Sequence, residues 1–343
     1  VKFQKASSSE WRDAESRTAL FNGDWVKTGG RASAELMFSN GALYTVGPNA
    51  LLEIYAAVAP GSTSKTNSVT MQVGSIEVDT RVKDATANIR TPGTQVVIES
   101  LSLAQVDVDQ AKGTDITASR GAASVAPASG GPAVRLAAGE RVSASEQGAL
   151  TQVKKLAPPP ALAPPGDNQI LQFGPELQIE FLWNPQASAS QYVLQVSRSR
   201  LFTTQEINSR RQKTSARAKI TGEGVFYWRV ASIGPDGAAG PFAEARKFRV
   251  VGGGNRSTPD KDPPKLALKA PFPLGGVFFT ISGTTEPGAS VFINDEEADV
   301  DSNGGFSKVV SMPKIGRNDV IVKAIDAAGN QEVQSQTVTV QEE

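Results

Sequence analysis

Short apolar runs separated by turn residues recur along the chain. The first clear pair, Ala34 to Phe38 and Leu43 to Val46, flanks the dipeptide Asn40-Gly41. Asn-Gly supplies the two positive-φ residues that a tight type I′ turn requires. The pattern therefore predicts a β-hairpin whose turn is formed by Asn40-Gly41.

The same strand-sized pattern continues toward the C-terminus. It is seen in Phe181 to Pro185, Tyr192 to Val196, Val225 to Val230, Lys247 to Val251, Ile281 to Asp295, Gly316 to Asn330 and Gln336 to Val340. Many short strands joined by turns are typical of an all-β protein. We expect a β-rich N-terminal domain, solenoid or sandwich-like, followed by two β-sandwiches in tandem.

Two segments of unusual composition divide the chain. Residues 157–167 are too rich in proline for a helix or a central strand, so this linker should be extended and semi-rigid. Residues 252–264 combine glycines, prolines and charged residues, which predicts a second, more flexible linker. The domains are therefore expected at 1–156, 168–251 and 265–343.

An ordered series of residues in the N-terminal domain resembles the FecR domain, a periplasmic module. The matching residues are Trp11, Leu20, Gly23-Asp24, Val26, Thr28, Leu36, Phe38, Asn40-Gly41, Gly47-Pro48-Asn49, Val73-Gly74, Ile89, Thr91-Pro92, Gly121, Val125 and Leu136 to Glu140. Each one is weak alone, because Gly, Pro and Asn mark turns in every β protein. The resemblance implies an exported protein of a Gram-negative bacterium, either periplasmic or associated with the outer membrane.

The segment 168–251 resembles a fibronectin type III domain. The likeness lies in Trp183, the strand Tyr192 to Val196, the strand Tyr227 to Val230 and the turn Gly240-Pro241-Phe242. Trp183 and Trp228 have two interpretations, as rings that stack on a sugar or as core side chains. Their place within alternating strands favours the core.

The segment 265–343 resembles a bacterial immunoglobulin-like domain. It contains Ile281 to Asp295, Gly304-Gly305-Phe306 and the run that ends at Asn330, in the order that such domains show. Such domains serve as spacers, stalks and adhesive modules alike, so this resemblance implies a fold and no particular function.

The composition says little about the fold, but it narrows the class of function. The chain has 343 residues, 35 basic and 35 acidic, so no overall charge draws it to nucleic acid or to a membrane. It contains no cysteine, which excludes disulfides. No apolar run reaches the ~18 residues of a membrane helix. The chain begins with Val1 and not with Met, so the sequence leaves open whether a signal peptide, an anchor or a LysM-like module precedes it.

The absence of His and Cys removes the usual proton shuttle, imidazole metal ligand and thiolate nucleophile. We therefore predict no enzyme, no catalytic residue and no cofactor. One calcium-like motif runs from Asp299 to Gly304 and matches the start of an EF-hand loop. The match fails at Val310, where that loop has a bidentate Glu. A β-turn explains the same residues, so we predict no metal ligand. In the calcium interpretation, Asp326 and Asn330 would supply further oxygen atoms.

Local charge is the remaining signal. The segment 198–219 contains seven basic residues against Glu206, and these are the candidate partner-binding face: Arg198, Arg200, Arg210, Arg211, Lys213, Arg217 and Lys219. From 281 to 343 the chain has eleven acidic and four basic residues. The basic residues are either a solvated surface or a contact for an anionic partner. Nucleic acid is not expected, because exposed aromatics are not interleaved with these charges.

Together these patterns predict a non-catalytic scaffold or interaction protein of the cell envelope. It would act through surface contacts with envelope proteins, with cell-wall glycan or with further copies of itself. Two alternatives remain. One is a FecR-type signalling regulator that contacts an outer-membrane receptor, and the other is a surface adhesin.

Overall fold

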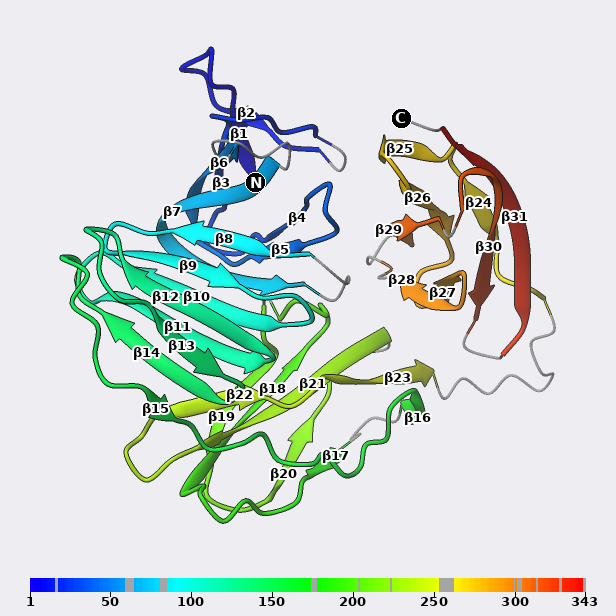
Figure 1. Ribbon diagram of the computed structural model, residues 1–343. Coiled ribbons are helices and arrows are strands. Elements are labelled where there is room, and N and C mark those ends of the chain that lie inside the picture. Colours follow the sequence, from blue (N-terminus) through cyan, green and yellow to red (C-terminus); the bar gives the residue numbers. More distant parts are fainter. Residues whose placement is uncertain are drawn as a thin grey trace.

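The computed structural model describes residues 1–343 except 16–17, 59–64, 81–84, 174–177, 203, 223, 253–261, 299, 301–303, 313, 327–328 and 342–343. Every regular element in the described residues is a strand. The strands form three groups that follow one another along the chain, β1–β15, β16–β23 and β24–β31 (Figure 1). We call them the N-terminal, central and C-terminal sandwiches. The predicted all-β, multi-sandwich fold is confirmed.

The N-terminal sandwich is one continuous sheet that doubles over at β7 (Lys65–Asp79). The first half of β7 pairs with β6 and β8, and its second half pairs with β5 and β10. Gly74 lies between the two halves with φ +110°, and a Cβ there would come within 2.5 Å of Ala50 Cα. Only glycine fits this close backbone approach.

The bend at β7 gives two layers. Layer A contains β1 (Lys2–Gln4), β2 (Arg12–Asp13), β3 (Trp25–Lys27), β6 (Leu51–Val58), the first half of β7, β8 (Ala87–Arg90), β9 (Thr94–Ile98), β12 (Ala122–Pro127) and β13 (Val134–Ala137). Layer B contains β4 (Ala34–Met37), β5 (Leu43–Val46), the second half of β7, β10 (Leu103–Asp109), β11 (Gly113–Arg120), β14 (Glu140–Ala144) and β15 (Lys154–Lys155).

Alternating side chains of the two layers fill one core. Ile54 and Ile89 from layer A and Val106 and Ile116 from layer B belong to the same buried cluster. The residues between them along each strand point away from the core, as the period-2 pattern of a strand requires. Each layer therefore has an outer face made of the intervening polar and aromatic residues.

The residues that resemble the FecR pattern hold the strands together. Asp24 is buried, and its carboxylate accepts hydrogen bonds from Lys5 Nζ (2.7 Å), Ala6 N (3.0 Å) and Phe21 N (2.9 Å). The Thr28 hydroxyl donates to Gly47 O and accepts from Ala50 N. The first motif is therefore tied to the Gly-Pro-Asn turn, and both have a structural role.

The predicted hairpin is present, with a different turn. Met37 pairs with Leu43, but only Gly41 has a positive φ (+84°), and Asn40 does not. The Gly41 amide donates to Phe38 O and the Phe38 amide donates to Ala42 O. This is a three-residue loop with a glycine bulge, so the predicted type I′ turn was wrong. Asn40 instead uses its side chain, which accepts from Ala42 N and donates to Thr86 O.

The central sandwich packs a six-stranded sheet against a two-stranded sheet. The first contains β16 (Gln169–Phe173), β23 (Arg246–Gly252), β21 (Gly224–Ile233), β18 (Gln191–Ser197), β19 (Ile207–Arg211) and β22 (Ala239–Phe242); the second contains β17 (Gln178–Leu182) and β20 (Ser215–Lys219). Trp183 and Trp228 are 3% and 0% exposed and contact Tyr192 and Phe181 edge-on. Their predicted place in the core is confirmed.

The proline-rich segment 157–167 lies along the central sandwich. Leu162 forms a bridge with Trp183 and packs against the central core. The backbone continues this contact, because Ala163 N donates to Leu182 O and Leu182 N donates to Pro164 O. This segment therefore acts as an additional edge of the sandwich and not only as a connection.

The C-terminal sandwich packs two four-stranded sheets. One contains β24 (Leu266–Leu268), β26 (Phe278–Thr285), β25 (Phe272–Gly275) and β29 (Gly305–Ser311); the other contains β28 (Glu296–Ala298), β27 (Ser290–Ile293), β30 (Gly316–Ile325) and β31 (Gln331–Val340). Val291, Val320 and Val322 lie at the centre of its core. Most of the second linker, 253–261, lies outside the described residues.

Candidate functional site

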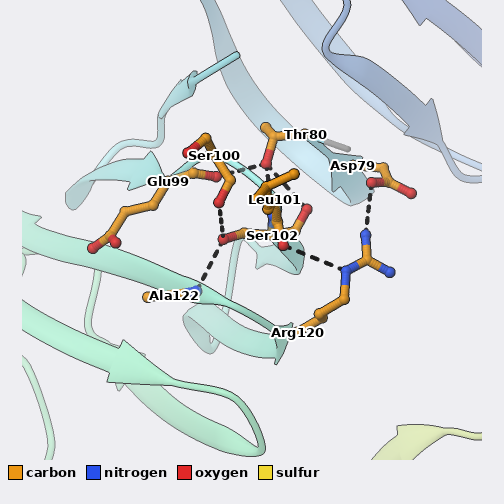
Figure 2. A network of polar contacts seen from close by, with 8 residues as sticks. All are labelled: Asp79, Thr80, Glu99, Ser100, Leu101, Ser102, Arg120 and Ala122. Atoms are coloured by element: carbon orange, nitrogen blue, oxygen red, sulfur yellow. Dashed lines mark hydrogen bonds and ion pairs between the residues drawn. The ribbon is translucent and has the colours of Figure 1, made fainter. Parts of the chain in front are cut away.

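A polar network in the N-terminal sandwich joins three chain segments (Figure 2). The Thr80 hydroxyl donates to Glu99 O (2.6 Å) and accepts from Ser102 N (3.0 Å). Ser102 Oγ in turn donates to Ser100 O and accepts from Ala122 N. Both hydroxyls are therefore occupied by backbone groups, and this network ties β7, the β9–β10 turn and the start of β12 together.

An ion pair closes the same network. Arg120 Nη2 lies 2.9 Å from Asp79 Oδ1, at the end of β7 (Figure 2). Neither hydroxyl faces a group that would take its proton, because the neighbouring acceptors are backbone carbonyls. An activated nucleophile needs an adjacent base. We therefore interpret this cluster as structural.

The outer face of layer B carries a row of polar residues in direct cross-strand register. The row crosses seven strands in the order Glu35, Thr45, Glu77, Gln105, Thr117, Arg141 and Lys154. The central sandwich contacts both ends of this row. Arg200 Nη2 lies 3.0 Å from Glu35 Oε1, and Asp236 forms an ion pair with Lys154. The outer face of layer B is therefore the junction with the central sandwich (Figure 1).

Arg229 occupies the middle of this junction. Its guanidinium lies 4.0 Å from the ring centre of Phe202 and 4.1 Å from that of Phe242, and its Nε donates to Gln195 Oε1. Burial lowers the pKa of Arg229 to about 10, and the nearby charge of Glu77 opposes this shift. Since the guanidinium stays charged at neutral pH, the stacked cation and Glu77 link the two sandwiches electrostatically.

A second junction connects the central and C-terminal sandwiches. Lys247 on β23 is buried and forms an ion pair with Glu297 on β28, and its Nζ lies 5.6 Å from the ring centre of Phe292. Arg249 donates to Ser290 Oγ. Both basic side chains belong to β23, which therefore holds the C-terminal sandwich against the central one.

The structure disperses the candidate basic face. Three of its seven residues form ion pairs, Arg198 with Glu206, Arg200 with Glu35 and Arg217 with Glu180. The remaining four are all exposed and lie on β19, on β20 and in the loop between these strands: Arg210, Arg211, Lys213 and Lys219. Since β19 and β20 belong to different sheets, these charges wrap around one edge of the sandwich. That this edge binds a partner stays a prediction.

The structure also brings together two aromatic surface residues that the sequence patterns did not indicate as a site. Trp25 and Tyr55 lie on the outer face of layer A, because they alternate with the core residues Val26 and Ile54. Alternation with buried neighbours was visible in the sequence and was the signal for their outward orientation. That they lie on neighbouring strands required the pairing of β3 with β6.

Within the described residues, no group of three or more Asp or Glu side chains is placed to hold a metal ion. The calcium-like motif has Asp299 and 301–303 outside the described residues. Asp326, named as an additional donor, accepts hydrogen bonds from Asn330 N and Asn330 Nδ2 and so caps a local turn. The described part of the chain also contains no helix long and apolar enough to cross a membrane.

One comparison with protein families matches part of the chain. Residues 277–342, from β26 to β31, match the family model of glucodextranase domain B, an immunoglobulin-like sandwich. This agrees with the immunoglobulin-like resemblance predicted for the C-terminal domain. No curated protein matches the chain.

Several solved structures match parts of the chain at low identity. A protein of Parabacteroides distasonis ATCC 8503 assigned as an anti-sigma factor is 14% identical over 38% of this chain, with a TM-score of 0.31. The chain covers 59% of that protein's length. The fibronectin(III)-like modules of Clostridium thermocellum CbhA are 14% identical, over 53% of this chain and 94% of theirs, with a TM-score of 0.23.

A bacterial ice-binding adhesin of 1.5 MDa, described for its retention at the host cell surface, is 12% identical. The match covers 86% of this chain and 98% of that one, with a TM-score of 0.21. These TM-scores are low, so we base no conclusion about this chain on them.

Proposed function

We propose that this chain is a non-catalytic scaffold or interaction protein of the Gram-negative envelope, located in the periplasm or at the outer membrane. Its N-terminal part would be a FecR-like domain, and its partners would be envelope proteins or cell-wall glycan. The observation that carries this proposal is the way the sandwiches are joined. Charged side chains fix them against each other at both junctions, while an outer sheet face and the basic edge formed by β19 and β20 remain exposed.

The composition supports a function without chemistry. The whole sequence lacks His and Cys, so catalysis would rest on carboxylates, Lys, Ser or Thr. The buried hydroxyls of the Figure 2 network are bonded to backbone groups. Broad β surfaces recognise partners by contact along their faces and edges.

Sedimentation with envelope fractions tests this proposal. The full chain should co-sediment with isolated envelopes from a Gram-negative bacterium. Treating the envelopes with protease beforehand separates contacts with protein from contacts with glycan. If the chain stays in the supernatant with every envelope fraction at low and at physiological salt, the proposal is wrong.

Charge reversal on the basic edge locates the contact. Arg210→Glu with Arg211→Glu changes the charge of the β19–β20 edge, and the matched control Lys314→Glu with Arg317→Glu makes the same change on the C-terminal sandwich. If the basic edge binds, only the first pair should weaken sedimentation, and added salt should weaken it in the wild type. Equal sedimentation of the two variants would place the contact elsewhere.

A further inference from the structure

The outer face of layer A carries aromatic side chains, and the ion pairs of the two junctions lie on other surfaces. Layer B is covered by the central sandwich through Glu35 and Lys154. Figure 1 shows β1, β2, β3 and β6 gathered at the end of the N-terminal sandwich that lies away from β16–β23. A ligand can therefore reach this end without separating the sandwiches.

The strand register places a polar row across this face. Gln4 pairs with Trp25, Trp25 with Glu53, Glu53 with Thr70, and Thr70 with Arg90. These residues are half-buried or exposed, while the core residues Val26, Leu52, Ile54, Val69, Met71 and Ile89 adjoin all of them except Gln4 along the strands. The row contains donors and acceptors of both charge signs, a mixture that suits a ligand with many hydroxyl groups.

Three aromatic rings accompany this row. Tyr55 lies two residues beyond Glu53, which makes it a diagonal neighbour of Trp25, about 7–8 Å away. Trp11 directly precedes β2, which is two strand spacings from β3, or about 10 Å. Lys27 Nζ lies 4.0 Å from the centre of the Trp11 ring, which places Trp11 on the same face as Lys27 and Trp25.

Cations fix two of the rings. Besides the contact of Lys27 with Trp11, the Arg90 guanidinium lies 4.8 Å from the centre of the Tyr55 ring. Such contacts hold aromatic side chains in place and reduce the entropy that a ligand would have to remove. Gln4, Trp25 and Glu53 also border a shallow open hollow of about 330 Å³ together with Lys5 and Ser8.

We propose that Trp11, Trp25 and Tyr55 form a binding platform for a neutral polysaccharide on the outer face of layer A. The apolar faces of sugar rings would pack on the aromatic rings, and sugar hydroxyls would bond to Gln4, Glu53 and Thr70. The separation of Trp11 from Trp25 is roughly two strand spacings, about 10 Å, comparable to a disaccharide repeat. This inference deepens the proposed function by assigning the glycan contact to one face.

A neutral polymer fits better than a polyanion or a protein. The platform and its row carry Lys27 and Arg90 against Glu53, a net charge of only +1, and the two cations already contact rings. The aromatic side chains are separated by polar residues and form no continuous apolar patch of the kind that buries a protein partner.

Four probes test the platform: protein-free peptidoglycan sacculi, chitin and cellulose by sedimentation, and dextran by affinity electrophoresis. The full chain should bind at least one of them, and salt should have little effect. Trp25→Ala and Tyr55→Ala should each weaken that binding roughly tenfold or more. Trp25→Phe should retain most of it, and Phe272→Ala, an exposed ring of the C-terminal sandwich, should leave it unchanged.

Tryptophan fluorescence measures binding in the wild type directly, without an alanine substitution. The chain has four tryptophans, and Trp183 and Trp228 are buried, so iodide quenching reports on Trp11 and Trp25. The bound polysaccharide should protect the wild type from iodide. The Trp25→Phe variant should still bind the polysaccharide. The bound polysaccharide should reduce its iodide quenching less than in the wild type, because only Trp11 remains as an accessible tryptophan.

Two results would overturn the platform. The first is that the wild type binds none of the four probes. The second is that the wild type binds a probe and that the alanine variants at Trp11, Trp25 and Tyr55 all bind it equally well. Envelope sedimentation that survives either result would keep the proposed function and move the contact to another surface. Loss of envelope sedimentation alone would refute the proposed function without touching polysaccharide binding by the pure chain.

Discussion

Single turn residues decide where this chain reverses direction. Asn294 and Asp295 both have positive φ values (+48° and +65°) and join β27 to β28 directly, since Ile293 pairs with Glu296. This two-residue loop has the geometry of a type I′ turn. At Asn40-Gly41, where the sequence predicts that turn, the loop is one residue longer and needs one left-handed residue, Gly41.

Gly121 lies between Arg120 and Ala122, two residues of the Figure 2 network, and its replacement should be costly. Its φ is +67°, and a Cβ would lie 2.1 Å from Ser102 Oγ. Gly139 has a similar φ (+81°) and open space around it. Gly139→Ala should therefore lower the free energy of unfolding by about 1–2 kcal/mol for backbone strain alone. Gly121→Ala should cost at least ~1 kcal/mol more, because the clash adds to the strain. Urea unfolding of both variants measures this difference, and equal losses would contradict it.

The buried Asp24 carboxylate should make stability depend on pH. Burial opposes its ionisation, but the hydrogen bonds from Lys5 and from the amides of Phe21 and Ala6 outweigh burial, and the pKa of Asp24 is lowered. Its contribution is therefore complete above the unfolded pKa, about 3.9, and is lost as pH falls through the lower folded value.

Asp24→Asn should lower the free energy of unfolding by about 1–3 kcal/mol at pH 7, because Asn cannot replace both carboxylate acceptors. The difference from wild type should shrink as pH falls below 4. Urea unfolding at pH 7 and pH 3 tests this, with Glu10→Gln as the control at an exposed ion pair. A pH-independent difference would show that the charge of Asp24 is not the cause.

At the scale of elements, the proline-rich segment is a part of the central sandwich. Proline removes backbone donors, so such a segment suits the edge of a sheet, where few donors are needed. Ala163 and Asn184 supply amides to the contact, and Leu162 supplies an apolar side chain.

Leu162→Ala should lower the stability of the central sandwich by about 1–2 kcal/mol, less than for a fully buried leucine because Leu162 is half-buried. Trp183, its bridge partner, should report the transition by its fluorescence. Pro159→Ala at an exposed position of the same segment is the control. If both variants unfold at the same midpoint, the segment is only a connection.

At the scale of the whole molecule, charged contacts join the sandwiches. Arg200, Arg229 and Lys154 act at the first junction, and Lys247 acts at the second. Polar junctions of this kind are weaker than a shared apolar core, so each sandwich retains its own buried cluster.

Limited proteolysis should therefore cut first between residues 252 and 264, which contain the glycines and prolines of the second linker. A C-terminal fragment of about 80 residues should remain folded. Residues 157–167 should resist cleavage, because their backbone is bonded to the central sandwich. Mass spectrometry of the first products checks this, and early cleavage inside 30–140 would contradict the division into three domains.

The sequence by itself determined the class of fold, several of the strands and the lack of His and Cys side chains. Alternation placed Trp183 and Trp228 in the core, and turn residues marked the hairpins, because these effects depend on neighbours a few positions away. The tertiary structure alone decided which outer faces are covered. The sequence placed Arg200 in the predicted basic face. In the structure Arg200 forms an ion pair with Glu35, which lies far away in the chain. Likewise, Trp25 and Tyr55 came together only through the pairing of β3 with β6, since register between strands is set by packing across the whole sheet.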